Sequence, residues 1–167
     1  MILSTHAVIG TAAAALFPTH PLLAFGVAFA SHFIADAIPH LEYHLYSLYR
    51  NPKDEMKNEI MMDARFVKDL SHISVDVSAG LLLSLLAASS LNAPVIPTVL
   101  LGAGGGLLPD FLQFVYWHFR HEPLRSLQRF HVWVHTEIHL RETPFFGIVS
   151  QIVLALGVAC LARLLQG

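Results

Sequence analysis

Five apolar stretches dominate this chain and limit what it can fold into. They cover approximately residues 2–17, 21–38, 72–91, 95–117 and 145–165. Hydrophobic residues make up 54% of the 167 residues and charged residues only 13%, whereas an ordinary soluble domain has about 25% charged residues. A helix of about 20 apolar residues can cross a bilayer. We therefore predict an all-α fold, a single integral-membrane domain over residues 1–167 with about five transmembrane helices.

Two polar segments, residues 41–70 and 120–143, separate these stretches, and hydrophobic residues recur in both at roughly helical spacing. We predict short surface helices in them. The two segments hold nine of the ten Lys and Arg residues, and five crossings place both on the side of the N-terminus. The positive-inside rule makes that side cytoplasmic. We expect an integral inner (cytoplasmic) membrane protein with its N-terminus in the cytoplasm and its C-terminus outside.

A glycine-rich run, "GAGGG" at residues 102–106, precedes "LLPDF" in the fourth stretch. Such glycines either let two helices approach closely or loosen the helix ahead of Pro109. Close helix packing is the favoured interpretation.

Histidine and aspartate side chains gather at the cytoplasmic ends of the predicted helices. Ionisable side chains at membrane depth normally face a bundle interior, a wet cavity or a bound ion. Because several helix ends bring such residues to one level, we predict that they surround a metal site. The candidate ligands are His6, His32, Asp36, His72, Asp76, Asp110, His131 and His135.

Spacing within this set supports the prediction. Pairs four residues apart, which share one helix face, occur at positions 32/36, 72/76 and 131/135. Neutral imidazole and carboxylate bind zinc and other divalent first-row metals, so the expected cofactor is a divalent metal, Zn first, with Mn or Fe as alternatives. Asp36, Asp76 and Asp110 are the predicted catalytic residues. For any single pair, an interhelical hydrogen bond without a metal is the alternative.

Four further residues have two interpretations each. His40 and His44 are either outer ligands or surface residues. Glu42 and Asp69 either orient a ligand imidazole from behind or are solvated, and the second interpretation keeps them out of the predicted ligand set.

The same motifs carry a family resemblance. "THAVIG", "HPLLAFGVAFASHFIADAIPH", "GLLPDFLQF" and "FHVWVH" resemble small bacterial integral-membrane proteins labelled membrane-bound metal-dependent hydrolases. More distantly, the chain is similar to zinc-dependent phospholipases C and single-strand-specific nucleases, all-helical enzymes with three zinc ions. The resemblance implies hydrolysis of phosphoester bonds, in a lipid or lipid-linked phosphate, by a di- or trinuclear His/Asp metal site at the cytoplasmic face.

The expected partners are the lipid bilayer and a phospholipid or polyprenyl-phosphate substrate. A formal net charge of −2 gives no indication of nucleic-acid binding. Arg120, Arg125 and Arg129 either hold a phosphate or, as we favour, contact anionic lipid head groups. The alternative function is a metal-ion or proton transporter or binding protein with the same cluster. A bis-His haem protein and a scaffold with a structural metal are further alternatives.

Overall fold

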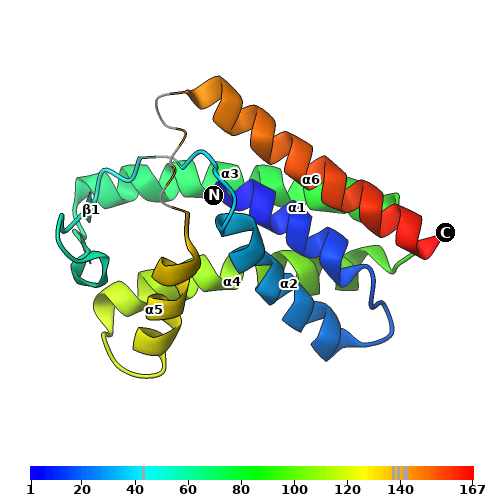
Figure 1. Ribbon diagram of the computed structural model, residues 1–167, viewed down its shortest axis with the longest axis horizontal. Coiled ribbons are helices and arrows are strands. Elements are labelled where there is room, and N and C mark those ends of the chain that lie inside the picture. The colour runs from blue at the N-terminus through cyan, green and yellow to red at the C-terminus, as the bar shows by residue number, and fades with distance from the viewer. Residues whose placement is uncertain (43, 137, 139, 141–142) are drawn as a thin grey trace.

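The computed structural model describes residues 1–42, 44–136, 138, 140 and 143–167, and this part of the chain is helical, as predicted (Figure 1). Its helices are α1 (Leu3–Ala14), α2 (Pro21–Asp36), α3 (Ala64–Ser89), α4 (Val95–His118), α5 (Leu124–Val134) and α6 (Pro144–Gln166). Between α2 and α3 lie two short antiparallel strands, β1 (Leu48–Tyr49) and β2 (Glu59–Ile60), and a single 3-10 turn, η1 (Glu55–Lys57).

Three helices in the described part of the chain are long and apolar enough to cross a membrane: α3, α4 and α6. This fits a membrane protein, but the prediction of five membrane-spanning helices is wrong. With 12 residues, α1 is only about 18 Å long, and α2, with 16 residues, about 24 Å. The hydrocarbon core of a bilayer is about 30 Å thick. The apolar character of these two helices therefore does not make them membrane spans.

Helix α1 instead forms the centre of the bundle. It packs against α2, α3, α4 and α6 (Figure 1), and its buried residues include Ser4, Thr5, His6 and Thr11. A helix enclosed by protein can carry polar side chains that a lipid-facing helix could not. This enclosure is what brings His6 into the interior.

Close contact between α1 and α4 depends on the glycine-rich run. A Cβ atom on Gly102 would overlap the backbone of Thr11, and a Cβ atom on Gly106 would overlap the carbonyl oxygen of His6. On the facing helix, a Cβ atom on Gly10 would overlap the Gly102 carbonyl. This arrangement confirms the close-packing interpretation, in which small residues four apart let two backbones touch.

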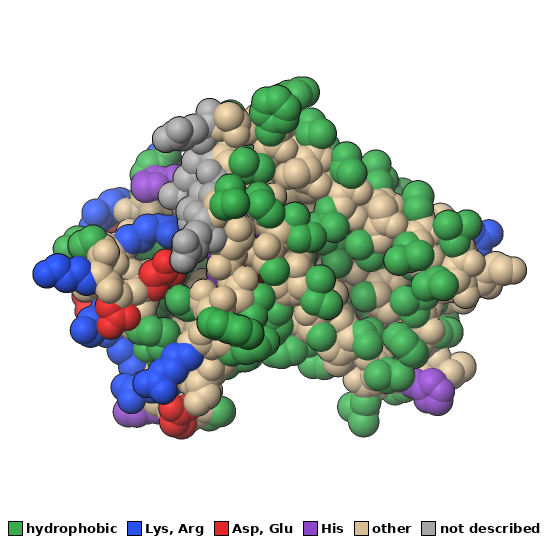
Figure 2. All heavy atoms as spheres, viewed as in Figure 1, with side chains coloured by type: hydrophobic (Ala, Val, Ile, Leu, Met, Phe, Trp, Pro, Cys, Tyr) green, Lys and Arg blue, Asp and Glu red, His purple; other side chains and the backbone are tan. Residues whose placement is uncertain are grey.

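The molecule has an apolar end and a charged end. Figure 2 shows hydrophobic side chains over most of the visible face, with Lys, Arg, Asp and Glu gathered at the end that carries β1 and α5. Arg163 lies near the C-terminus at the opposite end. The helical prediction for residues 41–70 is only partly right. Residues 48–60 form the strand pair and η1, and α3 begins at Ala64, where the Asp63 carboxylate accepts a hydrogen bond from the Arg65 backbone N–H.

Candidate metal centre

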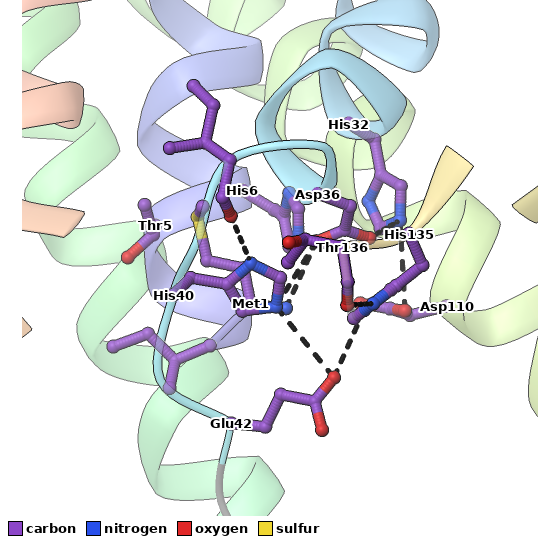
Figure 3. Close-up of polar contacts among 12 residues, drawn as sticks. Met1, Thr5, His6, His32, Asp36, His40, Glu42, Asp110, His135 and Thr136 are labelled. Carbon is purple, nitrogen blue, oxygen red and sulfur yellow. Dashed lines mark hydrogen bonds and ion pairs between the residues drawn. The ribbon is translucent and has the colours of Figure 1, made fainter. Parts of the chain in front are cut away.

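The buried carboxylate of Asp36, at the C-terminal end of α2, is the centre of the His/Asp cluster (Figure 3). Its Oδ2 atom lies 3.0 Å from Nε2 of both His32 and His131. Its Oδ1 atom lies 3.1 Å from Nε2 of His6 and 3.0 Å from the amino nitrogen of Met1. One carboxylate, 1% exposed, thus contacts nitrogen atoms from three separate parts of the chain.

Two overlapping groups in this cluster have the geometry to hold a metal ion. The first comprises His32, Asp36, Asp110 and His131, and the second comprises Asp36, His40 and His135. Within each group the candidate ligand atoms lie within 4.8 Å of one another. Asp36 belongs to both groups, so its carboxylate could contribute a ligand to each of them.

Glu42 borders the second group. Its Oε1 atom lies 3.0 Å from Nε2 of His135 and 3.7 Å from Nε2 of His40 (Figure 3). Burial opposes ionisation of Glu42, but the hydrogen bond with His135 outweighs it and holds the pKa of Glu42 well below its usual range. Burial likewise disfavours the charged form of His135, yet the hydrogen bond to Glu42 raises the pKa of His135. Glu42 therefore acts on the second group as an ionised partner.

Backbone carbonyl groups fix the orientation of two key imidazoles. Nδ1 of His32 lies 2.8 Å from the Gly106 carbonyl oxygen, and Nδ1 of His40 lies 2.7 Å from the Ile38 carbonyl oxygen. Each Nδ1–H donates to its carbonyl, so Nε2 is the nitrogen that each ring offers to a further partner. When such a ring is neutral, its Nε2 lone pair can bind a metal.

The same tautomers make the cluster fit a cation. Nε2 of His32 lies 3.0 Å from Oδ2 of Asp36, and the buried Nε2 of His40 has no hydrogen-bond partner. Lone pairs of nitrogen and oxygen repel each other unless a proton or a metal ion lies between them. A dication among these atoms would satisfy both imidazoles and compensate the buried carboxylates, so the residues present fit the predicted divalent metal.

Backbone pairing brings the second group together. The segment after α5 runs beside the end of α2, where the Thr136 N–H donates to the Asp36 carbonyl at 2.9 Å and the Leu140 N–H donates to the His40 carbonyl at 3.1 Å. These bonds place His135, just past the end of α5, opposite His40. Residues about 95 positions apart are thereby joined at one site.

Three of the eight predicted ligands lie outside both groups. His6 contacts the Asp36 carboxylate but belongs to neither group. The other two, His72 and Asp76, share the His-x-x-x-Asp pattern of positions 32 and 36. The Asp76 carboxylate accepts hydrogen bonds from the backbone N–H groups of Leu3 and Ser4, at 2.7 and 3.3 Å. It satisfies donors that the first turn of α1 leaves unpaired. His72 is exposed. Because α3 begins at Ala64 and not near residue 72, this pair sits along the middle of a long helix.

Two residues near the predicted set have larger roles than the sequence indicated. His40 is fully buried and belongs to the second group, and Glu42 holds His135. The sequence did contain an indication that His40 is a ligand, because His40 continues the four-residue spacing of positions 32 and 36. Pro39 weakened this indication, since it predicts that the helix ends before His40. Asp69 accepts hydrogen bonds from the backbone and hydroxyl of Ser47 and so holds a loop. His44 is exposed.

A cavity of about 870 Å³ opens beside the cluster. Asp110, His131 and His135 line it, and so does an apolar stripe of α3 made by Phe66, Leu70, Ile73 and Val77. Among the described residues, Arg50 is the only Lys or Arg in this lining. Arg120, Arg125 and Arg129, for which phosphate binding was the less favoured interpretation, do not line the cavity. Arg120 donates to Glu59 and the Asn58 carbonyl.

No protein-family model, no curated protein and no solved structure matches this chain. Conclusions about its function therefore depend on the geometry of the site.

Proposed function

We propose that this protein is a membrane-embedded, metal-dependent hydrolase of phosphoester bonds that acts on a lipid or lipid-linked phosphate. The observation that carries the proposal is the position of Asp36, a buried carboxylate shared by two groups of metal-ligating side chains. Enzymes that hydrolyse phosphoesters commonly hold two ions about 3.5–4 Å apart with a bridging group. The His and Asp donors suit Zn, with Mn or Fe as alternatives.

Ions bound there would act as Lewis acids and lower the pKa of a bound water toward neutrality. The protein supplies the ligands and their alignment. Asp36 joins the two groups, the Gly106 and Ile38 carbonyls fix the imidazole rings of His32 and His40, and Glu42 orients His135.

Access to the centre supports turnover of a substrate. Asp110 is 27% exposed and lines the cavity, in contrast to the enclosed His32 and Asp36. Arg50 also lines the cavity, and its guanidinium lies 3.4 Å from the Glu42 carboxylate. A phosphate in the cavity could therefore contact both the metal ligands and this cation. Arg50 is therefore the residue that we assign to binding the phosphate.

The depth of the site favours a lipid phosphate. The cluster lies where the apolar part of the molecule meets its charged end (Figures 1 and 2). Eight of the nine Lys and Arg residues in the described part of the chain belong to residues 41–70 and 120–143, so the positive-inside rule favours a cytoplasmic position for the charged end. Phosphates of membrane lipids lie at this level of a bilayer.

Metal content and turnover together test the proposal. Protein purified in detergent should contain about two Zn, Mn or Fe ions per chain, and Asp36→Asn should remove them. His72→Ala is the matched control for His32→Ala, because both change a His of a His-x-x-x-Asp pair and only His32 lies in the cluster. Vesicles containing phospholipid or polyprenyl phosphate should then show hydrolysis that chelators abolish. Metal-loaded protein that hydrolyses no phosphoester but carries ions across proteoliposomes would instead identify a transporter.

A further inference from the structure

The cavity beside the metal centre has two kinds of edge. Five of the described residues that line it are exposed: Arg50, Glu55, Leu70, Phe111 and Trp133. The first two belong to the segment between α2 and α3 and form a charged rim. The other three, which we call the apolar rim, lie on α3, α4 and α5 and are 48%, 60% and 78% exposed. Large apolar side chains gathered at an opening indicate contact with lipid or with an apolar ligand.

The helices that carry the apolar rim suit a bilayer. Two of them, α3 and α4, are long and apolar enough to cross a membrane. Trp133, on α5, is of a residue type that is enriched at the boundary between lipid and water. In a bilayer these helices would turn the apolar rim toward lipid, while the charged rim stays with the end of the molecule that is rich in Lys and Arg.

The apolar rim lies at the level of the metal centre. A short connection, residues 90–94, joins α3 to α4, so the two helices run antiparallel. Near the charged end of the molecule they meet where the rings of Phe66 and Phe114 stack, with centroids 5.8 Å apart. One turn further into the bundle, Leu70 on α3 is level with Asp110 on α4, a member of the first metal group. A chain that passes the apolar rim therefore arrives beside a metal ligand.

An apolar wall continues inward from this rim. Phe66, Leu70, Ile73 and Val77 line the cavity at the spacing of three and four residues that one helix face requires. This stripe of α3 is about 16 Å long, close to half of the roughly 30 Å hydrocarbon core and thus to the depth of one leaflet. Leu107 adds apolar surface from α4. The wall suits a hydrocarbon chain laid along α3.

We infer that the hydrocarbon chain of the substrate binds in the cavity between α3 and α4 and enters it sideways from the bilayer, through the apolar rim. The inference rests on the proposed function, since the metal centre and Arg50 would hold the phosphate to which the chain is attached. It adds a binding site for the chain to that proposal. A phosphoester without such a chain should therefore bind poorly.

Equilibrium binding of alkylphosphonates tests the chain site without turnover, because hydrolysis does not cleave their carbon–phosphorus bond. Calorimetry on the zinc-loaded protein in detergent compares hexylphosphonate with methylphosphonate, which has five fewer methylenes. Each methylene removed from water increases affinity about fourfold. Wild type should therefore bind hexylphosphonate at least about thirtyfold more tightly, even if only half of the added chain is buried.

Two variants narrow the cavity at the proposed chain site. Ile73→Trp should lower the affinity ratio at least about tenfold, because the larger side chain takes the space of about two or more methylenes. Leu70→Trp, at the exposed rim, makes the same test without changing a partly buried position. Both should leave the affinity for methylphosphonate unchanged. Val75→Trp is the matched control, since Val75 lies on the same helix, is 71% exposed and is outside the cavity lining.

The outcomes separate the chain site from the proposed function. A wild-type ratio near one, no binding of hexylphosphonate at millimolar concentration, or equal ratios in all three variants would overturn the chain site. Hydrolysis of phosphoesters regardless of chain would leave the proposed function standing alone. Chain-dependent binding by protein that hydrolyses no phosphoester would support the chain site and overturn the enzyme.

Discussion

The Nδ1 atom of His32 lies 2.8 Å from the carbonyl oxygen of Gly106, and this contact ties the metal centre to the packing of the bundle. Gly106 is also where α4 touches α1, because a Cβ atom there would overlap the His6 carbonyl. One backbone position therefore sets both the helix spacing and the tautomer of a proposed ligand.

Gly106→Ala should lower both stability and metal content. The added methyl group has to push α1 away from α4, an overpacking effect that typically costs about 1–3 kcal/mol. The shift also moves the carbonyl that orients His32. Thermal unfolding and elemental analysis of the purified variant measure the two effects. Gly104→Ala is the control, since its Cβ atom would meet nothing within 4 Å. Equal behaviour of the two variants would contradict the link between packing and metal binding.

His40→Ala should remove about one metal ion per chain, because His40 belongs only to the second of the two groups. The first group keeps all its donors in this variant. His44→Ala, at an exposed position four residues further on, should retain the wild-type stoichiometry. Elemental analysis against protein concentration distinguishes them. Full metal retention by His40→Ala would restrict the centre to the first group.

Asp76→Ala should destabilise the protein by about 0.5–2 kcal/mol, the usual effect of losing a side-chain acceptor at a helix start. Its carboxylate accepts from the N–H groups of Leu3 and Ser4 and lies in neither metal group. Metal content should therefore stay at the wild-type level. Asp76→Asn keeps an acceptor and should be milder. Loss of metal from Asp76→Asn without a change in unfolding would show that Asp76 is a ligand after all.

Arg50→Gln should weaken the binding of phosphate to the metal-loaded protein by roughly tenfold, since a charge-assisted hydrogen bond contributes about 1.5–3 kcal/mol before solvent screening. Arg50 lines the cavity beside Glu42. Lys53→Gln removes the same charge from the same surface loop, at a residue outside the lining. Titration with inorganic phosphate measures the affinity of each variant. Similar phosphate affinities of the two variants would show that Arg50 does not bind the phosphate.

Much of the candidate centre could be predicted from spacing. Residues four apart share a helix face wherever the helix lies, so His32 with Asp36 could be paired in advance. Spacing does not tell which way the face points. The identical pattern predicted that His72 and Asp76 would join the same site, but the structure leaves His72 exposed and uses Asp76 to complete the first turn of α1.

The number of membrane spans was less predictable. Hydropathy indicates that a helix has apolar surroundings, but it does not tell whether lipid or protein provides them. In α1 the apolar residues face protein. Ala7 and Ala12 are fully buried among neighbouring helices. An apolar sequence suits such a protein interior as well as it suits lipid. Only the length of the helix, 12 residues, separates the two cases, and helix ends are blurred in a run such as residues 2–17.

The enclosure of α1 has a consequence for biogenesis. The ribosome makes this helix before α3 and α4, the helices that later cover it. Helix α1 is too short to cross the bilayer and carries a histidine and hydroxyl groups. We therefore expect it to reach its enclosed position only after the helices that cover it have been made. The candidate metal centre is therefore completed only after α4, α5 and the segment that follows α5 have been made.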